Sequence, residues 1–515
     1  MIQETPEMPA RRTACFRAAL VLTTAAVLVS LPAIRCSGRR PAAEPVAEVI
    51  RNLLQPATQT ISSGLLDLGI HSRLTPVFYG RRDCFPAWLD DNGLRPQARS
   101  LLGALAEAQA EGLDPCEYGR DRAEALVFLA ERKVKDFRNL PPRFRAEVDA
   151  VLTDAFFLYA SHLSAGKVNP ASGLTGRGWP PEEEGLVGLL EHSLAGDEVR
   201  PALLGLRPQH EYYLGLRRAL GDFRRQVSGL EAVMTEAAPG VPLAGRKLLA
   251  RQRALLDRQV ETLRLNMERW RWLPRSLGRR FVLIDTAVFR LLVADRGRTP
   301  MSMKVVVGNL AWPTPVLSAE ITGFIINPNW NCTPNIFYKE TINFIKADKN
   351  YLAANKMVIL QGWGSAEKEL DPASLDWAKV NPRNYPTLHL RQLPGPLNIL
   401  GRLKFIMPNP EDIYLHDTPY QDDFKQKERI FSHGCIRAEK PFDLASFLAG
   451  SPLWTKDTIR IAIDSLEELK VYLRAPVPIY VNYFTAWPGP DGRVEFRRDV
   501  YSRDGALAAA LNTIN

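Results

Sequence analysis

The stretch Ser432-His433-Gly434-Cys435-Ile436-Arg437 decides both the fold and the chemistry predicted for this chain. It is preceded by His416, within the run Tyr414-Leu415-His416-Asp417. A free cysteine has a pKa of about 8.5 and is mostly protonated at neutral pH, so it is a weak nucleophile. A nearby imidazole that accepts the thiol proton removes this limit. The pattern therefore predicts an activated thiol, with Cys435 as the nucleophile.

The residues alone leave two other interpretations of this stretch open. In the first, Cys435 is a buried structural cysteine without a catalytic role. In the second, Cys435 is the nucleophile but His433, rather than His416, is its base. His433 lies only two residues before Cys435 on a tight turn, where an imidazole reaches the sulfur poorly. We therefore expect His416 to be the base, as an imidazole that titrates near neutrality. Gly434 permits a strained turn, and the backbone N–H groups around 433 to 435 are expected to face a developing oxyanion.

Composition excludes several classes of protein. The chain has 515 residues, enough for two to four domains, and its hydrophobic content of 46% is ordinary for a globular protein. Its net charge of +9 is mildly basic, but clustered basic runs with interleaved aromatic residues are missing. We therefore expect no nucleic-acid partner. A solvated basic surface, or attraction to anionic cell-wall or membrane surfaces, accounts for the charge.

The six cysteines form no Cys-x-x-Cys pair, so a zinc ribbon or a thioredoxin-like site is excluded. They are Cys15, Cys36, Cys84, Cys116, Cys332 and Cys435. We expect no metal and no cofactor. The sequence does not decide whether Cys84 and Cys116 form a disulfide, because it does not give the distance between them in space. Cys435 must remain a thiol if it is the nucleophile.

The N-terminal region is typical of export. Arginines precede a mostly apolar segment from Ala18 to Ile34, which has the length of a signal peptide or a short membrane anchor. We expect residues 1–40 to be a signal peptide or signal-anchor and residues 41–515 to lie outside the cytoplasm. Cys36 follows Arg35 rather than a small residue, which argues against lipidation at this cysteine.

The hydrophobic pattern changes period along the chain. From about 61 to 230 it is helical, with apolar faces along Arg99 to Gly112 and Phe144 to Ala165. Short β-rich segments begin at 281, and Asp295-Arg296-Gly297-Arg298 predicts a hairpin turn. Strands are expected again at 399–407, 413–416 and 459–463. Residues 331–395 interrupt the strands just before the site and are expected to form a lid.

The spacing of His416 from Ser432-His433-Gly434-Cys435 resembles the signature of the YkuD-type L,D-transpeptidases, which cross-link bacterial peptidoglycan. Further blocks resemble the large, multi-domain periplasmic branch of that family. These blocks cover Met267 to Pro274, Asn327 to Asn331, Arg391 to Pro396, Lys404 to Asn409 and Tyr483 to Trp487. A weaker resemblance, to the N-terminal scaffold of that branch, covers about 75 to 225. The peptidoglycan-binding module usual in the branch is not recognisable in the forty residues 226–265.

The resemblance implies an α+β chain, with a helical N-terminal scaffold followed by a mainly-β YkuD-like catalytic domain. The expected divisions are a scaffold at 41–225, a helical connector at 226–278, the catalytic domain with its capping lid at 279–464, and a C-terminal extension at 465–515. The expected partners are peptidoglycan stem peptides as donor and acceptor, and other cell-wall synthesis proteins. The membrane is contacted only through the N-terminal segment.

The resemblance also implies roles for single residues. Cys435 is the nucleophile, His416 the base, and His433 and Gly434 shape the turn and the oxyanion hole. The substrate-binding candidates are Arg437, Ser432 and Trp330, with Tyr338, Asn398 and Lys404 as secondary groove candidates. Arg437 suits the carboxylate of a diaminopimelate-type stem. The reaction expected is acyl transfer through a thioester. The alternatives are an L,D-carboxypeptidase or amidase, a D-amino-acid exchange enzyme with the same site, or an inactive wall-binding scaffold.

Overall fold

The computed structural model describes residues 44–54, 70–90, 92–132, 139–169, 183–236, 243–489 and 491–513. The segment 18–34, expected to direct export, lies outside these ranges. No helix within them is long and apolar enough to cross a membrane. The chain divides into two compact units. The first comprises Met1–Gln109, Leu113–Ser161 and Glu182–Leu204, and the second Ala110–Gly112, His162–Pro181 and Gly205–Asn515.

The first unit is helical. Its helices are α1 (Glu44–Leu54), α3 (Leu74–Arg81), α4 (Pro96–Ala106), α5 (Arg120–Arg132), most of α6 (Pro142–Ala165), α7 (Glu183–Gly196) and most of α8 (Val199–Leu206). The helices expected near 99–112 and 144–165 are confirmed as α4 and α6, although α4 ends at Ala106. The first unit thus matches the helical fold expected for the N-terminal region.

A buried carboxylate ties α6 to the segment that follows α3. Asp149 accepts the backbone N–H groups of Ala87 and Trp88, and Tyr79 Oη donates to it at 2.6 Å. Burial raises the pKa of Asp149, and these donors oppose that rise. Because the carboxylate is fully buried, loss of one donor would leave a costly unpaired acceptor.

Two thiols outside the site are buried. Cys84 in the first unit makes no disulfide, so the pairing with Cys116 that the sequence left open is not formed. Burial raises the pKa of the Cys84 thiol. Cys332 in the second unit is also a buried thiol, and burial raises its pKa to about 12. Both thiols are therefore poor nucleophiles at neutral pH.

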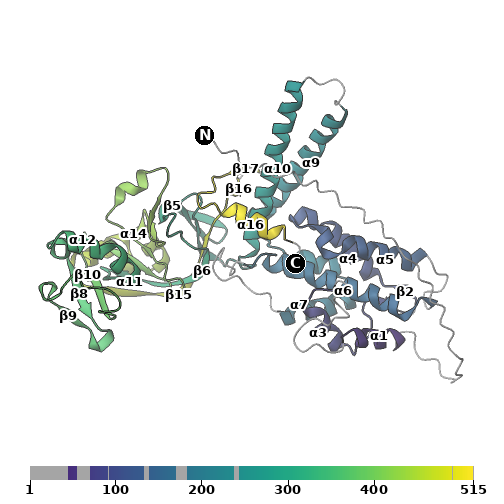
Figure 1. Cartoon of the computed structure of the whole chain (residues 1–515), viewed down its shortest axis with the longest axis horizontal. Helices are drawn as coiled ribbons and strands as arrows, with labels where there is room; N and C mark the ends of the chain where they lie inside the picture. Colours follow the sequence, from purple (N-terminus) through teal and green to yellow (C-terminus); the bar gives the residue numbers. More distant parts are fainter. Residues whose placement is uncertain are drawn as a thin grey trace. The chain divides into compact units, whose positions relative to one another are not determined.

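The second unit begins with a helical hairpin. Helices α9 (Glu211–Glu236) and α10 (Leu243–Arg271) run side by side (Figure 1), and the boundary expected between scaffold and connector at 225 falls inside α9. Met267 and Trp270 at the end of α10 are buried against Leu283 of the sheet. The hairpin is therefore joined to the sheet through its base.

The second unit is built on a nine-stranded sheet with the order β13-β5-β14-β12-β11-β6-β15-β3-β4. An additional pairing of β4 with β5 closes eight of these strands into a ring. In chain order the strands are β3 (Arg280–Asp285), β4 (Arg290–Asp295), β5 (Arg298–Gly308), β6 (Leu317–Ile326), β11 (Leu403–Ile406), β12 (Leu415–His416), β13 (Ile430–Ser432), β14 (Ile436–Ala438) and β15 (Leu469–Asn482). The hairpin turn expected at 295–298 is confirmed, since Asp295 pairs with Arg298.

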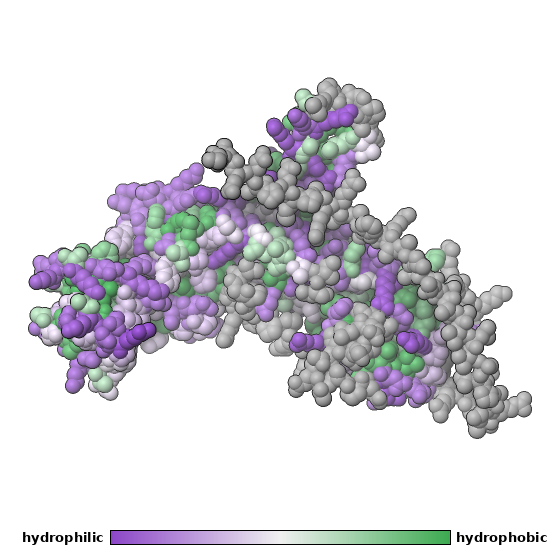
Figure 2. Space-filling view, in the orientation of Figure 1, coloured by the Kyte–Doolittle hydropathy of each residue, from purple (hydrophilic) through white to green (hydrophobic). Residues whose placement is uncertain are grey.

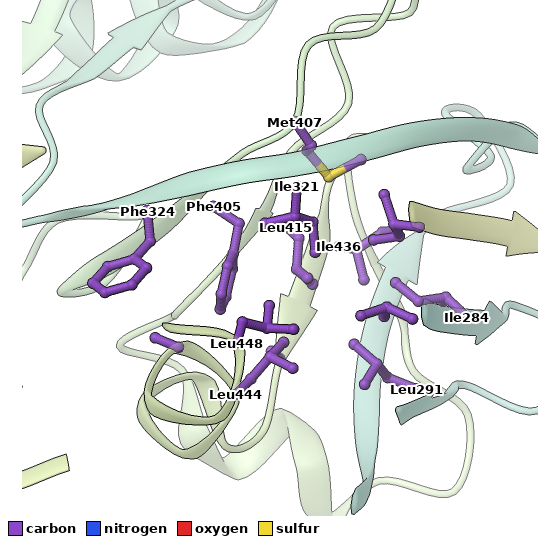
Figure 3. Close-up of a cluster of buried hydrophobic side chains, with 14 of the residues drawn as sticks. Ile284, Leu291, Ile321, Phe324, Phe405, Met407, Leu415, Ile436, Leu444 and Leu448 are labelled. Carbon is purple, nitrogen blue, oxygen red and sulfur yellow. The ribbon is translucent and has the colours of Figure 1, made fainter. Parts of the chain in front are cut away.

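One face of this sheet carries the hydrophobic core. Leu415, Ile436 and Phe405 point into it, and Leu444 and Leu448 of α14 (Pro441–Ala449) cover them (Figure 3). Burial of each such side chain contributes about 1.5–3 kcal/mol. Because side chains alternate along a strand, the residues between these core positions face the opposite side. That opposite side holds the candidate site.

The segment between β6 and β11 forms a separate layer. It contains a four-stranded sheet in the order β7-β10-β8-β9, with bounds Trp330–Cys332, Leu388–Gln392, Met357–Gln361 and Lys368–Leu370 in that order. Its helices are α11 (Pro334–Ile336), α12 (Ile342–Ala347) and α13 (Tyr351–Ala354), with a π-helical turn at Phe337–Thr341. A hydrophobic core of its own holds it together. Hydrophilic residues cover much of its visible face (Figure 2). We call this segment the insertion.

Two sequence expectations are wrong in the second unit. Residues 459–463 form part of helix α15 (Lys456–Asp464) rather than a strand. The Oγ1 atom of Thr455 caps this helix by accepting the Thr458 N–H at 3.2 Å, which starts helical backbone in an otherwise β-rich run. The boundary expected at 464 also divides the sheet, because β15 lies between β6 and β3 as one of its strands.

Candidate active site

Three polar side chains form a row across the centre of the sheet. Lys404 of β11 pairs with His416 of β12, which pairs with Arg437 of β14. Directly paired residues on adjacent strands share a face of the sheet. The row therefore lies on the side opposite the core, where period-2 alternation places it. Three segments distant in the sequence meet there.

Cys435 lies directly before β14, two residues before Arg437, and is half-buried. Its Sγ atom is 4.0 Å from the carbonyl oxygen of Asp412. Burial raises the pKa of the thiol, while a backbone hydrogen bond from Tyr414 and the charges of Lys404 and Arg437 act in the opposite direction. Burial outweighs these effects, so Cys435 is protonated at neutral pH and needs a base.

His416 is suited to that role. It is only 3% exposed, and its Nδ1 atom lies 2.5 Å from the backbone oxygen of Asp417. A carbonyl oxygen only accepts, so Nδ1 carries the proton and Nε2 keeps a lone pair. Burial and the positive charge of Arg437 lower the pKa of His416 to about 3. The ring is thus a neutral base at physiological pH, and the expectation that it titrates near neutrality is corrected.

Asp417 holds the His416 ring through its backbone rather than its carboxylate. The Oδ2 atom of Asp417 instead accepts the Arg402 N–H at 2.8 Å. It also packs tightly against Gly401, where an added Cβ would lie 2.4 Å from that oxygen. The Asp417 carboxylate therefore fixes the loop before β11, and the His416 imidazole is held by the Asp417 backbone carbonyl instead.

His433 points towards the insertion. Its Nε2 atom lies 2.9 Å from each carboxylate oxygen of Glu340 in the π-helical turn. A carboxylate accepts, so Nε2 carries the proton, and the Nδ1 atom keeps the lone pair in the neutral ring. The ring also lies 6.2 Å from that of Trp312. The contact turns His433 towards the insertion, so its imidazole ties the nucleophile turn to Glu340.

The turn before Cys435 is held by Ser432. Its Oγ atom accepts the Gly434 N–H at 3.2 Å and donates to the backbone oxygen of Cys435. Ser432 is only 3% exposed, so its hydroxyl shapes the turn and is not available to bind substrate. The Gly434 N–H is likewise occupied. No acceptor within the described residues takes the Cys435 N–H, which leaves that group as an oxyanion donor.

Gly434 is required by the shape of this turn. Its φ is +107°, a conformation that residues with a Cβ rarely adopt. A Cβ at this position would lie 3.2 Å from Ile413 Cδ1. On its other side, Thr314 Oγ1 donates to the Gly434 carbonyl at 2.7 Å. The turn is therefore fixed from both sides.

The two cations of the row have local partners. The Nη1 atom of Arg437 donates to Asp423 at 2.8 Å, and the guanidinium lies 5.4 Å from the centre of the Tyr420 ring. A substrate carboxylate would have to share Arg437 with Asp423. Lys404 Nζ lies 3.5 Å from the centre of the Tyr414 ring, and burial lowers its pKa.

The other sequence candidates lie in packed positions. Trp330 is 9% exposed and belongs to the core of the insertion. Tyr338 Oη donates to the Tyr385 backbone oxygen at 2.6 Å. Asn398 Nδ2 donates to the backbone oxygen of Pro328 at 3.0 Å and also to Gln392 and Leu393. These three residues hold the insertion together rather than lining the row.

Sequence analysis missed three residues that the fold brings to the site. They are Glu340 against His433, Thr314 against Gly434, and Asp423 against Arg437. The first two pairs are separated by 93 and 120 residues. No periodicity or motif connects residues so far apart. Asp423 is only 14 residues from Arg437, but it stands in an acidic pair that has the pattern of a solvated turn.

No group of three or more potential metal-ligating side chains occurs among the residues that the structure describes. A model described as the YkuD L,D-transpeptidase catalytic domain matches residues 279–478. The chain carries an L,D-transpeptidase catalytic domain. The sheet, the insertion, Cys435 and His416 all lie within it. A second model, described as a scaffold domain, matches residues 73–220.

A curated relative supports the L,D-transpeptidase domain. The chain is 32% identical over 251 residues to a Haemophilus influenzae protein named "Putative L,D-transpeptidase". The match covers 49% of this chain and 50% of that protein. The chain therefore spans about half the length of this curated relative.

Two solved structures share weak similarity with the chain. One is the avibactam carbamoyl enzyme of Ldtfm, at 10% identity over 40% of this chain and 50% of that one. The other is an L,D-transpeptidase from Mycobacterium smegmatis, at 14% identity over 40% of this chain and 58% of that one. The TM-score is 0.19 in both cases, too low to support any structural argument about the L,D-transpeptidase domain.

Proposed function

We propose that this chain is a peptidoglycan L,D-transpeptidase that uses Cys435 as its nucleophile and His416 as its base. The observation that carries the proposal is the place of His416 on β12, the strand that pairs with β14 directly after Cys435. His416 has its Nδ1 atom held by a carbonyl, whereas the Nε2 atom of His433 is held by Glu340. A neutral imidazole beside a protonated thiol is the starting state for general-base catalysis.

The first step is acylation of the thiol. The Nε2 atom of His416 takes the proton from Sγ as the sulfur attacks the carbonyl between the L-centre of the third stem residue and a terminal D-amino acid. The Cys435 N–H stabilises the oxyanion that forms. Collapse of the tetrahedral intermediate breaks the peptide bond. His416 returns its proton to the departing amine, leaving a thioester on Cys435.

The second step is transfer to an amine acceptor. The amine of a second stem peptide attacks the thioester carbonyl, and His416 accepts the proton that this amine loses. A new peptide bond forms, and the protonated thiol is restored. Lys404 and Arg437 lie beside His416 and Cys435 and stabilise negative charge as the proton leaves the thiol.

The insertion acts as the lid of this site. Its Glu340 reaches the turn that precedes the nucleophile, and Lys339 Nζ lies 5.5 Å from the centre of the Trp312 ring on the loop before β6. Both contacts anchor the insertion beside the nucleophile turn. A cover in this position protects a thioester from water until an amine arrives.

The expected setting is the cell envelope. Peptidoglycan stems lie outside the cytoplasm, and the apolar segment 18–34 provides a route for export. The proposed partners are donor and acceptor stems bearing a diaminopimelate-type carboxylate, with other cell-wall synthesis proteins nearby.

The proposal is tested with purified protein and a tetrapeptide muropeptide, with products measured by mass spectrometry. His416→Ala should slow acylation by about 10²–10⁴-fold, the size of a general-base contribution. His433→Ala should cost less, because the backbone donors remain. A harmless change at 416 with a severe loss at 433 would reverse the two roles. If the intact enzyme gives only tripeptides when acceptor is abundant, the chain is an L,D-carboxypeptidase instead.

A further inference from the structure

A second concave site lies on the catalytic unit, formed by residues outside the proposed active site. This groove has a volume of about 490 Å³ and is bounded by the start of α9, the segment that follows α10 and the β4–β5 hairpin. Four arginines line it: Arg275, Arg279, Arg296 and Arg298. Glu211 is the only carboxylate among its lining residues. The groove is therefore strongly positive.

Three of these guanidinium groups are available to a ligand. Arg275 donates to the backbone oxygen of Gly205. Arg279, Arg296 and Arg298 are exposed, and none of them forms an ion pair with any residue in the described part of the chain. Exposed arginines with no carboxylate partner, gathered around one hollow, suit an anion with several charges.

The floor of the groove is apolar. Phe281 and Leu277 are buried there, and Leu292 and Ala294 pack against the same core. The rim also includes Tyr212 and His210, whose rings stack with centroids 5.0 Å apart. An apolar and aromatic floor beneath guanidinium groups fits a sugar or peptide that bears carboxylates better than it fits a small inorganic ion.

A membrane surface is a poorer fit. None of the large exposed hydrophobic side chains of the described chain lines this groove. A membrane-binding surface combines basic residues with apolar side chains that enter the lipid. The groove has the charge but lacks the inserting side chains.

We infer that this groove is a second, non-catalytic site that binds carboxylate-bearing stems of peptidoglycan strands. The inference rests on the proposed function for the identity of the polymer. It adds a holding site that keeps the enzyme on the wall while Cys435 acts on another stem.

The test measures equilibrium binding of the full chain to purified sacculi, with Cys435→Ala in every sample to prevent turnover. The groove variant combines Arg279→Ala, Arg296→Asn and Arg298→Ala. Asparagine is chosen at 296 because that residue has a φ of +49°. The matched control is Arg251→Ala, Arg258→Ala and Arg474→Ala, which removes the same charge from exposed positions outside the groove.

The groove variant should bind sacculi about tenfold more weakly, as expected for the loss of three exposed charge pairs, and the control should stay within about twofold. Amidation of the sacculus carboxylates should abolish the difference between the two variants. Equal affinity in the two variants, or a difference that survives amidation, overturns the inference. Loss of binding to anionic phospholipid vesicles, with sacculus binding intact, would overturn it in favour of a lipid site.

Two further measurements keep the result decisive. Arg298→Glu alone, in the exposed hairpin turn, should also weaken sacculus binding if the triple variant fails to fold. With Cys435 intact, the groove variant should turn over a soluble tetrapeptide within about twofold of the wild type. Failure of the proposed activity would abolish this turnover in every form, whereas failure of the groove inference would leave turnover intact and sacculus binding unchanged.

Discussion

Glu340 of the insertion and His433 of the nucleophile turn form a direct link, with His433 Nε2 2.9 Å from both carboxylate oxygens. The two residues are 93 positions apart in the sequence. The link joins the proposed lid to the turn that carries Cys435.

Loss of the contact between Glu340 and His433 should affect how the acyl-enzyme breaks down more than how fast the acyl-enzyme forms. Glu340→Ala should lower the ratio of cross-linked dimers to hydrolysed tripeptides several-fold, because a loosened lid admits water to the thioester. The ratio is measured by mass spectrometry of muropeptide products. Glu369→Ala is the control, since Glu369 is exposed in the same insertion and forms no ion pair with the described residues. An unchanged ratio in the Glu340 variant contradicts the lid.

The buried His416 should make the protein less stable in acid. The unfolded state binds a proton near pH 6.5, whereas the folded state binds it only near pH 3, so stability is full above 6.5 and falls as the pH drops below it. Between pH 7.5 and pH 5 the loss from this residue should be about 2 kcal/mol. Denaturant unfolding at both pH values measures it. His416→Gln should reduce the acid sensitivity by a similar amount, and identical sensitivity in the two proteins contradicts the buried, neutral ring.

Gly434→Ala should damage the site while leaving the fold intact. The positive φ and the close approach of Ile413 predict a cost of about 1–3 kcal/mol, concentrated in the turn that holds Cys435. Acylation should fall steeply, as followed with a tetrapeptide donor. Gly229→Ala in the middle of α9 is the contrasting control, because nothing lies within 4 Å of the added methyl group. That change should raise stability by about 0.5–1 kcal/mol. Equal activity in the two variants would show that the turn tolerates a side chain.

Thiol-reactive inhibitors should discriminate between the cysteines of the catalytic unit. Cys435 is half-buried and Lys404 and Arg437 oppose the rise of its pKa, whereas Cys332 is 3% exposed and its pKa is raised to about 12. A carbapenem, which we expect to acylate the nucleophile, should add once and at Cys435. Peptide mapping after intact-mass analysis locates the adduct. Modification of Cys332, or an adduct that persists in Cys435→Ala, contradicts the assignment.

The sequence predicts best where local pattern and structure coincide. The strand expected at 399–407 contains β11, in which Lys404 lies between the core residues Leu403 and Phe405, and the helix expected at 144–165 follows its apolar stripe. The resemblance identifies Cys435 and His416 by their motif. The helix at 456–464 was missed because a run of isoleucines reads as a strand until the cap at Thr455 is considered.

Long-range pairing is the part that sequence does not reveal. No local sequence pattern indicates that Glu340 contacts His433 or that β15 lies between β6 and β3 in the sheet. The roles of Ser432 and Trp330 differ from expectation for the same reason. The hydrogen bonds of Ser432 depend on the conformation of the nucleophile turn, and the packing of Trp330 depends on the folded core of the insertion.

The most direct test of the account is intact-mass spectrometry of the enzyme mixed with a tetrapeptide donor and no amine acceptor. The account predicts a transient mass increase equal to the tripeptide acyl group, located at Cys435, with release of one D-amino acid. The adduct should form slowly in His416→Ala and be absent from Cys435→Ala. Turnover by the Cys435→Ala protein, or an adduct on any other residue, would contradict the central claim.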